Sequence, residues 1–172
     1  MENVILVDEQ DKAIGIMEKQ RAHVEGALHR AFSIFIFNSE KKLLLQKRAS
    51  SKYHCGGLWT NTCCSHPREN EVLQDAANRR LVEEMGMTCE LTPIFSFVYK
   101  AQFENGLTEH EFDHVFFGES NQIPSINRDE VEDFRFVAIE ELQLEIIESP
   151  QNFTPWFLIA LDRVNEFNAF QS

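Results

Sequence analysis

Thiol, imidazole, guanidinium and carboxylate groups are concentrated in residues 60–86 of the chain. The string TNTCCSHP occupies residues 60–67, and the helical pattern that follows ends with RRLVEEMG at residues 79–86. A thiolate is a nucleophile or base, an imidazole binds metal ions, and guanidinium groups bind phosphate. So many reactive groups within one loop and one helix indicate a catalytic or binding segment.

Residues 65–87 resemble the Nudix box, G-x5-E-x7-R-E-U-x-E-E-x-G-U, in which U is aliphatic. The spacing is kept throughout, but Ser65 replaces the first Gly and Arg80 replaces the Glu that follows the Arg. In a Nudix hydrolase this Glu binds the divalent metal of the hydrolytic centre, so a cation there favours a phosphate instead. The other matching positions are Glu71, Arg79, Leu81, Glu83, Glu84, Gly86 and Met87. Alternatively, the two arginines form i,i+4 ion pairs with Glu83 and Glu84 on an exposed helix surface.

Three histidines and two glutamates are candidate metal ligands. Glu109 and Glu111 are two residues apart on an expected strand, so their side chains share one face. His23, His29 and His66 lie in polar segments, and three imidazoles with two carboxylates suit one divalent ion. Each histidine taken alone is more often a hydrogen-bonded structural residue. The remaining polar candidates are given structural roles: His54, His110 and His114, with Asp113 as a solvated or salt-bridged neighbour.

Cys64 is the candidate reactive thiol, because it lies two residues before His66 and would share its face on an extended segment. A nearby metal or cation would lower its pKa. Alternatively it is a small buried hydrophobe, as we expect for Cys63. Four basic residues in separate segments would hold a diphosphate if they converge and are solvated charges if they do not: Lys19, Arg48, Lys52 and Arg80.

The composition is that of one globular domain spanning residues 1–172. The formal net charge of −12 argues against nucleic-acid or anionic-membrane partners. The N-terminus does not resemble a signal peptide, and no apolar run approaches membrane-spanning length. Four cysteines without a CxxC pair favour a reduced, cytoplasmic compartment, and we expect a monomer.

The pattern of apolar residues predicts a mixed β-sheet between helices, an α/β or α+β sandwich. We expect residues 18–28 to be polar and irregular, and residues 48–57 to form a loop. Strands are predicted at residues 4–8, 31–37, 43–47, 58–64, 95–103, 111–117 and 132–138, with hairpins around residues 38–41 and 104–106. Helices are predicted at residues 70–85, 140–148 and 154–167.

Together these residues resemble the type I isopentenyl-diphosphate isomerase family, which has the Nudix fold. The matching stretches extend from Glu18 to Trp156, and the TN-x-x-C-x-HP string with the E-x-E pair at 109–111 is the most specific. They also include EK at 18–19, LH at 28–29, RA-x-SK at 48–52, LW at 58–59, Tyr99 and TPW at 154–156. The family has Arg80 where hydrolases have Glu. Cys55-Gly56-Gly57 and Ser65 are departures that remove no functional group.

The resemblance implies conversion of isopentenyl diphosphate to dimethylallyl diphosphate by a protonation–deprotonation 1,3-allylic shift. It implies that Cys64 and Glu111 are the acid–base pair and that Tyr99 assists proton delivery. The implied ligands of one divalent metal (Mn, Zn or Mg) are His23, His29, His66, Glu109 and Glu111, while Glu84 helps to bind a second ion, Mg, with the substrate diphosphate. Lys19, Arg48, Lys52 and Arg80 would contact the diphosphate, and Trp156 would line the hydrocarbon end.

Two other classes of protein remain as alternatives. A Nudix hydrolase of a diphosphate substrate would release phosphate or pyrophosphate, and Arg80 argues against it. A non-catalytic metal- or nucleotide-binding domain would bind metal without turnover and would leave Cys64 and Tyr99 without a role.

Overall fold

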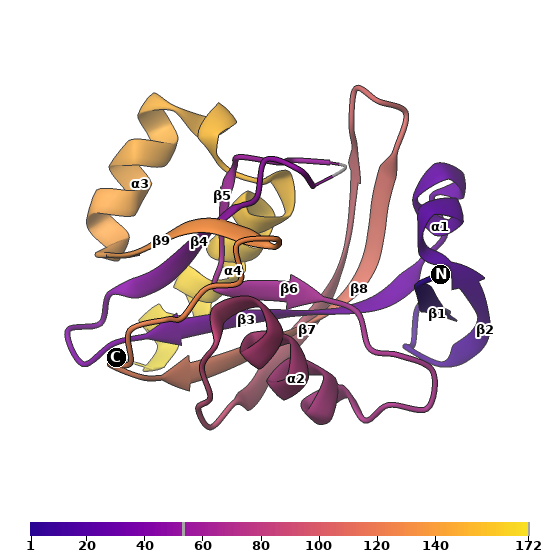
Figure 1. Ribbon diagram of the computed structural model, residues 1–172, viewed down its shortest axis with the longest axis horizontal. Helices are drawn as coiled ribbons and strands as arrows, with labels where there is room; N and C mark the ends of the chain where they lie inside the picture. Colours follow the sequence, from indigo (N-terminus) through magenta and orange to yellow (C-terminus); the bar gives the residue numbers. More distant parts are fainter. Residues whose placement is uncertain (53, 172) are drawn as a thin grey trace.

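The computed structural model describes residues 1–52 and 54–171 and contains a curled mixed sheet with helices on both faces (Figure 1). The strands are β1 (Asn3–Val7), β2 (Ala13–Glu18), β3 (His29–Phe37), β4 (Leu43–Arg48), β5 (Trp59–Thr60), β6 (Cys63–Ser65), β7 (Thr92–Gln102), β8 (Thr108–Glu119) and β9 (Val131–Val137). The helices are α1 (Lys19–Glu25), α2 (Leu73–Met85), α3 (Ile139–Glu148) and α4 (Pro155–Gln171), with a 3-10 turn, η1 (Pro150–Asn152). The predicted mixed sheet between helices is confirmed.

β3 lies at the centre of this sheet. It pairs in parallel with β8 along its whole length and antiparallel with β6 and with one residue of β1. β8 pairs in turn with β7, forming the long hairpin that projects beyond the sheet in Figure 1. Because β6 and β8 flank the same strand, residues that follow Cys63 are brought close to residues near 110.

Two hydrophobic cores cover the two faces of β3, which explains its nearly continuous apolar sequence. Phe32, Ile34 and Ile36 face α2 and pack in one cluster with Leu81 and Met85. The alternate residues face the other core, which includes Phe35, Phe37, Phe97, Tyr99, Trp156, Phe157 and Leu161. The strand period of two therefore separates the packing of α2 from that of α4.

The predicted hairpin of β3 and β4 has its turn, but its strands pair only between Phe37 and Leu43. Thr62 enters between them: its hydroxyl accepts a hydrogen bond from Ile36 N at 3.0 Å and donates one to the Leu44 carbonyl at 2.6 Å. The Thr62 side chain thus satisfies backbone groups that a ladder would otherwise pair. The strands diverge, and residues 59–65 lie between them.

Residues 18–28 are not irregular, and this prediction was wrong. β2, which the sequence pattern did not indicate, extends to Glu18, and α1 follows directly. The Glu18 carboxylate accepts hydrogen bonds from Gln20 N (3.0 Å) and Arg21 N (2.9 Å), and Gly26 ends the helix with φ +67°. Such a short helix carries too few residues for a clear periodicity. Its role is to turn His23 inward, where the side chain is buried.

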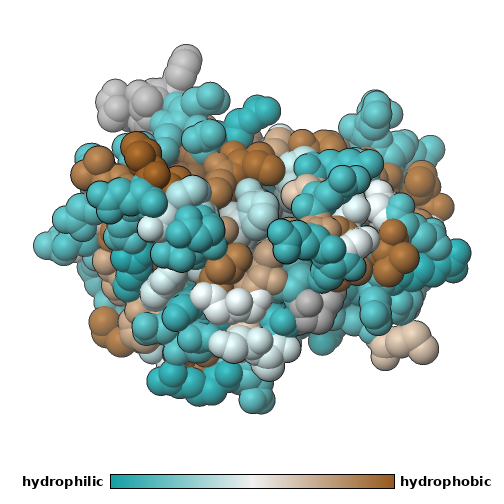
Figure 2. All heavy atoms as spheres, turned by 90° about the horizontal axis from the view of Figure 1, so that it is seen from above, coloured by the Kyte–Doolittle hydropathy of each residue, from teal (hydrophilic) through white to brown (hydrophobic). Residues whose placement is uncertain are grey.

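The surface has no single apolar face in the view of Figure 2, where hydrophobic residues lie in several patches separated by hydrophilic ones. Exposed apolar side chains include Ile14, Leu144 and Ile147. Within the described residues, no helix has both the length and the apolar character needed to cross a bilayer.

Gly86, which ends α2, is expected to tolerate no side chain. Its φ is +60°, and an added Cβ would lie 2.2 Å from the Ser125 carbonyl oxygen. Gly106 in the β7–β8 turn has φ +81° but open space around it. We expect Gly86→Ala to lower the free energy of unfolding by about 2–5 kcal/mol, and Gly106→Ala by about 1–2 kcal/mol. If urea denaturation showed the same loss in the free energy of unfolding for both variants, this account of the Gly86 contact would be contradicted.

Candidate active site

The orientation of Cys64 is set by a buried polar network in residues 60–62. The Asn61 amide donates to the Ile34 carbonyl (3.1 Å) and the Cys63 carbonyl (2.9 Å), and its oxygen accepts from Cys64 Sγ at 2.9 Å. Thr60 Oγ1 lies 2.8 Å from Thr154 Oγ1, next to the start of α4. The TN pair of the sequence motif therefore ties Cys64 to β3 and to the helix that carries Trp156.

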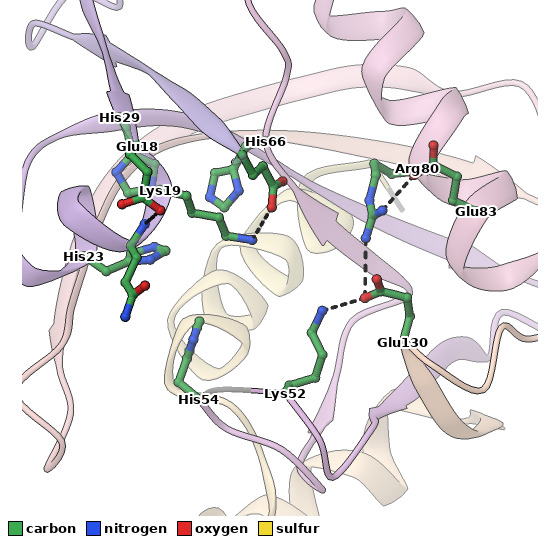
Figure 3. Close-up of polar contacts among 12 residues, drawn as sticks. Glu18, Lys19, His23, His29, Lys52, His54, His66, Arg80, Glu83 and Glu130 are labelled. Carbon is green, nitrogen blue, oxygen red and sulfur yellow. Dashed lines mark hydrogen bonds and ion pairs between the residues drawn. The ribbon is translucent and has the colours of Figure 1, made fainter.

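Four residues from separate segments bring metal-binding atoms together. Ligand atoms of His23, His29, His66 and Glu109 all lie within 4.8 Å of one another. They come from α1, β3, the end of β6 and β8, and Figure 3 shows the three imidazoles gathered on one side of the site. Glu111 adjoins them, with its Oε2 2.7 Å from His66 Nε2.

His29 presents its Nε2 atom to this group. Its Nδ1 lies 2.9 Å from the Ala27 carbonyl oxygen, which only accepts hydrogen bonds, so Nδ1 carries a proton. In the neutral ring Nε2 is then a lone-pair donor, and it lies 3.4 Å from Glu111 Oε2. Two electron-rich atoms in this position require a cation between them, either a proton or a metal ion.

The charges in the site are strongly shifted by burial and by one another. Burial alone would raise the pKa of Glu111, but hydrogen bonds from His29 and His66 hold it well below its ordinary value. Burial likewise lowers the pKa of His66, whereas the hydrogen bond and charge of Glu111 outweigh burial and raise that of His29. Tyr99 donates a hydrogen bond to Glu111, and its own pKa is raised by burial and by the Glu111 charge. The cluster thus holds an ionised carboxylate among imidazoles.

The donor set fits a divalent ion. Ligands of one ion at bond lengths of about 2.1 Å lie roughly 3–4 Å apart, close to the separations in this group. Three imidazoles with carboxylate oxygens suit Zn, Mn and other divalent ions. Glu84 lies apart from this group, beside Arg80, and accepts hydrogen bonds from Gln46 Nε2 (3.0 Å) and Cys63 Sγ (3.1 Å).

The four predicted basic residues line one cavity of about 50 Å³. Arg80 forms an ion pair with Glu84 at 2.5 Å. Lys52 forms one with Glu130 at 2.5 Å, as Figure 3 shows. Lys19 pairs with Glu2 at 3.2 Å, and Arg48 places its guanidinium 5.1 Å from the ring centre of Trp156. The residues that share the cavity wall with them include Cys64, His66, Glu84, Tyr99, Glu109, Glu111 and Trp156.

The i,i+4 pairs considered as surface pairs are formed, but one of them is not at the surface. Arg79 pairs with Glu83 and also with Glu71, at 2.7 Å, and is not among the residues that line the cavity. Arg80 and Glu84 are mostly buried and face the cavity. Arg80 is therefore available to a ligand of the cavity, which Arg79 is not.

Burial, rather than a nearby cation, has the largest effect on the pKa of the Cys64 thiol. It raises the pKa of Cys64 to about 12, and the charges of Asp113 and Glu84 act in the same direction. The expected lowering of this pKa is therefore not seen, and Cys64 enters the site as a protonated thiol. A group in this state is a proton donor.

Two residues that were given structural roles lie in the cavity wall instead. His54 Nε2 is 2.8 Å from Glu109 Oε1, and Asp113 is 2% exposed with its carboxylate accepting from Ser33 Oγ at 2.7 Å. Burial and the Glu111 charge raise the pKa of Asp113 well above its ordinary value. The alternation of Asp113 with Glu109 and Glu111 could have predicted that Asp113 lies in the site. For His54 the only indication in the sequence was that it is close to Lys52. His110 is hydrogen-bonded to the Gly26 carbonyl oxygen, and His114 is hydrogen-bonded to the Asp11 carboxylate. Both histidines lie outside the cavity.

Comparison with known proteins shows the family and the fold. Residues 27–157 match the NUDIX domain family. In solved structures, the fold resembles DR0079 from Deinococcus radiodurans (TM-score 0.72, 21% identity, 86% of this chain and 90% of that one) and a MutT NUDIX hydrolase from Burkholderia pseudomallei (TM-score 0.63, 23% identity, 80% and 98%). At these identities the structures show the fold alone.

Curated relatives show to which family within the Nudix fold the chain belongs. A Pectobacterium atrosepticum protein named Isopentenyl-diphosphate Delta-isomerase is 52% identical over 98% of this chain and 95% of its own length. Isopentenyl-diphosphate Delta-isomerase 2 of Aromatoleum aromaticum is 55% identical over 95% of this chain and 86% of its own. The chain is thus a Nudix-fold protein, and within that fold it belongs to the isopentenyl-diphosphate Delta-isomerase family.

Metal binding should stabilise the fold, because the ligands come from segments that meet only in the folded chain. At a free Mn²⁺ or Zn²⁺ concentration about 100 times the Kd, we expect a gain of about 2.7 kcal/mol in the free energy of unfolding. His29→Ala should abolish most of this gain, whereas His114→Ala should keep it. Thermal melts with and without the ion, followed by chelation, measure the effect; an equal gain in both variants would place the ion elsewhere.

Proposed function

We propose that the protein interconverts isopentenyl diphosphate and dimethylallyl diphosphate by adding a proton to one alkene carbon and removing another. The observation that carries this proposal is that one cavity combines four cations with a half-buried thiol, a buried carboxylate and an indole. Cations suit a diphosphate, and the remaining groups suit a hydrocarbon that gains and loses protons. The names of relatives at 52–55% identity support the same substrate.

The diphosphate end of the substrate is assigned to Lys19, Arg48, Lys52 and Arg80. Guanidinium groups bind phosphate oxygens in a bidentate way, and ammonium groups act as point charges. Glu84, which accepts a hydrogen bond from Arg80, would help to bind a Mg ion that accompanies the diphosphate. The acidic chain as a whole repels such a ligand, so these local cations must provide the attraction.

The hydrocarbon end is assigned to Cys64, Glu111, Tyr99 and Trp156. Cys64 and Glu111 are carried by β6 and β8, the strands that flank β3, so an acid and a base can act on one flat substrate from different sides. In the forward direction a proton is added to the terminal alkene carbon, and one is lost from the carbon next to the ester-bearing carbon. Tyr99, which donates a hydrogen bond to Glu111, assists this proton transfer.

Protonation of the alkene gives a tertiary carbocation, which offers no hydrogen-bonding group. The face of Trp156 can stabilise such a cation, by about 2 kcal/mol or more when water is excluded. Trp156 is 5% exposed and packs with Phe103 and His54. Exclusion of water also prevents the cation from being trapped as an alcohol.

We assign the divalent metal (Mn, Zn or Mg) to His23, His29, His66, Glu109 and Glu111. When bound, the ion supplies positive charge that stabilises the ionised carboxylates and orients Glu111. The residues themselves hold the geometry: Ala27 fixes the tautomer of His29, and Tyr99 and His66 fix the Glu111 carboxylate.

Cys64→Ala should abolish most of the isomerisation, with a loss of about 10²–10⁴-fold in kcat, which is the usual contribution of a general acid. Metal content and thermal stability should be nearly unchanged, because the thiol is not among the proposed ligands. The assay follows dimethylallyl diphosphate formed from isopentenyl diphosphate with Mg and Mn present.

Cys89→Ala is the matched control, because Cys89 is a half-buried free thiol outside the cavity. It should retain wild-type turnover. Near-normal turnover in Cys64→Ala would remove this thiol from the mechanism. Release of phosphate or pyrophosphate by the wild type, without isomerisation, would favour the Nudix hydrolase instead.

A further inference from the structure

His54 is held in the cavity wall by contacts on several sides. Its ring packs against Trp156 with ring centres 5.7 Å apart, Phe103 at 5.4 Å and His23 at 5.6 Å. Its carbonyl oxygen accepts a hydrogen bond from Arg48 Nη2 at 3.3 Å. His54 is 9% exposed, so its ring orientation is constrained by packing and by its backbone. In Figure 3 it faces the imidazole group from the loop that also carries Lys52.

The hydrogen bond between His54 and Glu109 has a defined direction. An ionised carboxylate only accepts hydrogen bonds, so His54 Nε2, 2.8 Å from Glu109 Oε1, carries the proton. His66 Nε2 also lies close to a carboxylate oxygen, 2.7 Å from Glu111 Oε2, but His66 belongs to the group of ligand atoms within 4.8 Å of one another, and His54 does not. We therefore treat His54 as a hydrogen-bond donor to Glu109 and not as a metal ligand.

The two oxygens of Glu109 are thereby given different partners. Oε1 faces His54, and Oε2 lies 3.5 Å from His23 Nε2, within the group of metal-binding atoms. Glu109 is 4% exposed, so an oxygen without a partner would be costly. The hydrogen bond to Oε1 fixes the carboxylate so that Oε2 stays on the side of His23 and could serve as a metal ligand.

We propose that His54 is a positioning residue for the metal site: its Nε2–H orients Glu109 and thereby raises the affinity of the site for a divalent ion. It also links this site to the loop of residues 49–57, which carries the diphosphate-binding Lys52. The proposal rests on the metal site assigned above. Groups that orient a ligand in this way typically change metal affinity by about 10–100-fold.

The experiment measures Mn²⁺ affinity without substrate, from the electron paramagnetic resonance signal of the free ion during titration. We expect His54→Ala to weaken binding by about 10–100-fold. His54→Gln should restore affinity to within about threefold, because the Gln amide can donate to Oε1 from a similar position. His114→Ala is the matched control, since His114 also bonds a carboxylate, Asp11, at 2.8 Å but outside the cavity; it should bind as the wild type does.

The outcomes separate this proposal from the metal site itself. Wild-type affinity in His54→Ala would overturn the positioning role while leaving the site intact. A loss in His54→Gln as large as that in His29→Ala would also overturn it, because it would make the imidazole a ligand. No Mn²⁺ binding by the wild type at all would refute the metal site. If His54→Ala does not fold, the comparison of His54→Gln with wild type and His29→Ala decides between these outcomes.

Discussion

The burial of three carboxylates on one face of β8 is the constraint on which the rest of the structure depends. Glu109, Glu111 and Asp113 alternate along the strand with exposures of 4%, 7% and 2%. Buried carboxylates are costly unless they are paired, bonded to donors or protonated. Imidazoles, the Tyr99 hydroxyl and the Ser33 hydroxyl supply these partners here. α1, the start of β3 and the end of β6 must therefore converge on β8, and a divalent cation held by this group would complete the neutralisation.

The cationic side chains of the cavity follow the same rule, that a buried charge needs an opposite charge beside it. Cations that would hold a diphosphate are themselves paired with carboxylates: Lys19 with Glu2, Lys52 with Glu130, and Arg80 with Glu84. An acidic chain can thus carry a cationic pocket without leaving buried positive charge uncompensated. Cys64 and Trp156 line the same cavity and add a thiol and an aromatic ring to these charged groups.

Much of this arrangement could be predicted from residue types and spacing. Alternating apolar residues indicated the mixed sheet. The altered Nudix box led to the prediction that Arg80 binds a phosphate, and Arg80 does line the cavity. The remainder depended on tertiary contacts that leave little local signal. α1 is too short to show a period, and its cap is a Glu rather than Ser or Asp. The separation of β3 and β4 depends on the hydroxyl of Thr62, and the place of His54 depends on a loop whose course the sequence does not encode by any periodicity.

The central claim is that this site moves protons on an alkene and does not hydrolyse a diphosphate. Proton NMR of the purified protein with isopentenyl diphosphate and Mg in deuterated buffer tests it most directly. The account predicts dimethylallyl diphosphate that carries deuterium in a methyl group, with no free phosphate. Release of phosphate or pyrophosphate without deuterated isomer would contradict it.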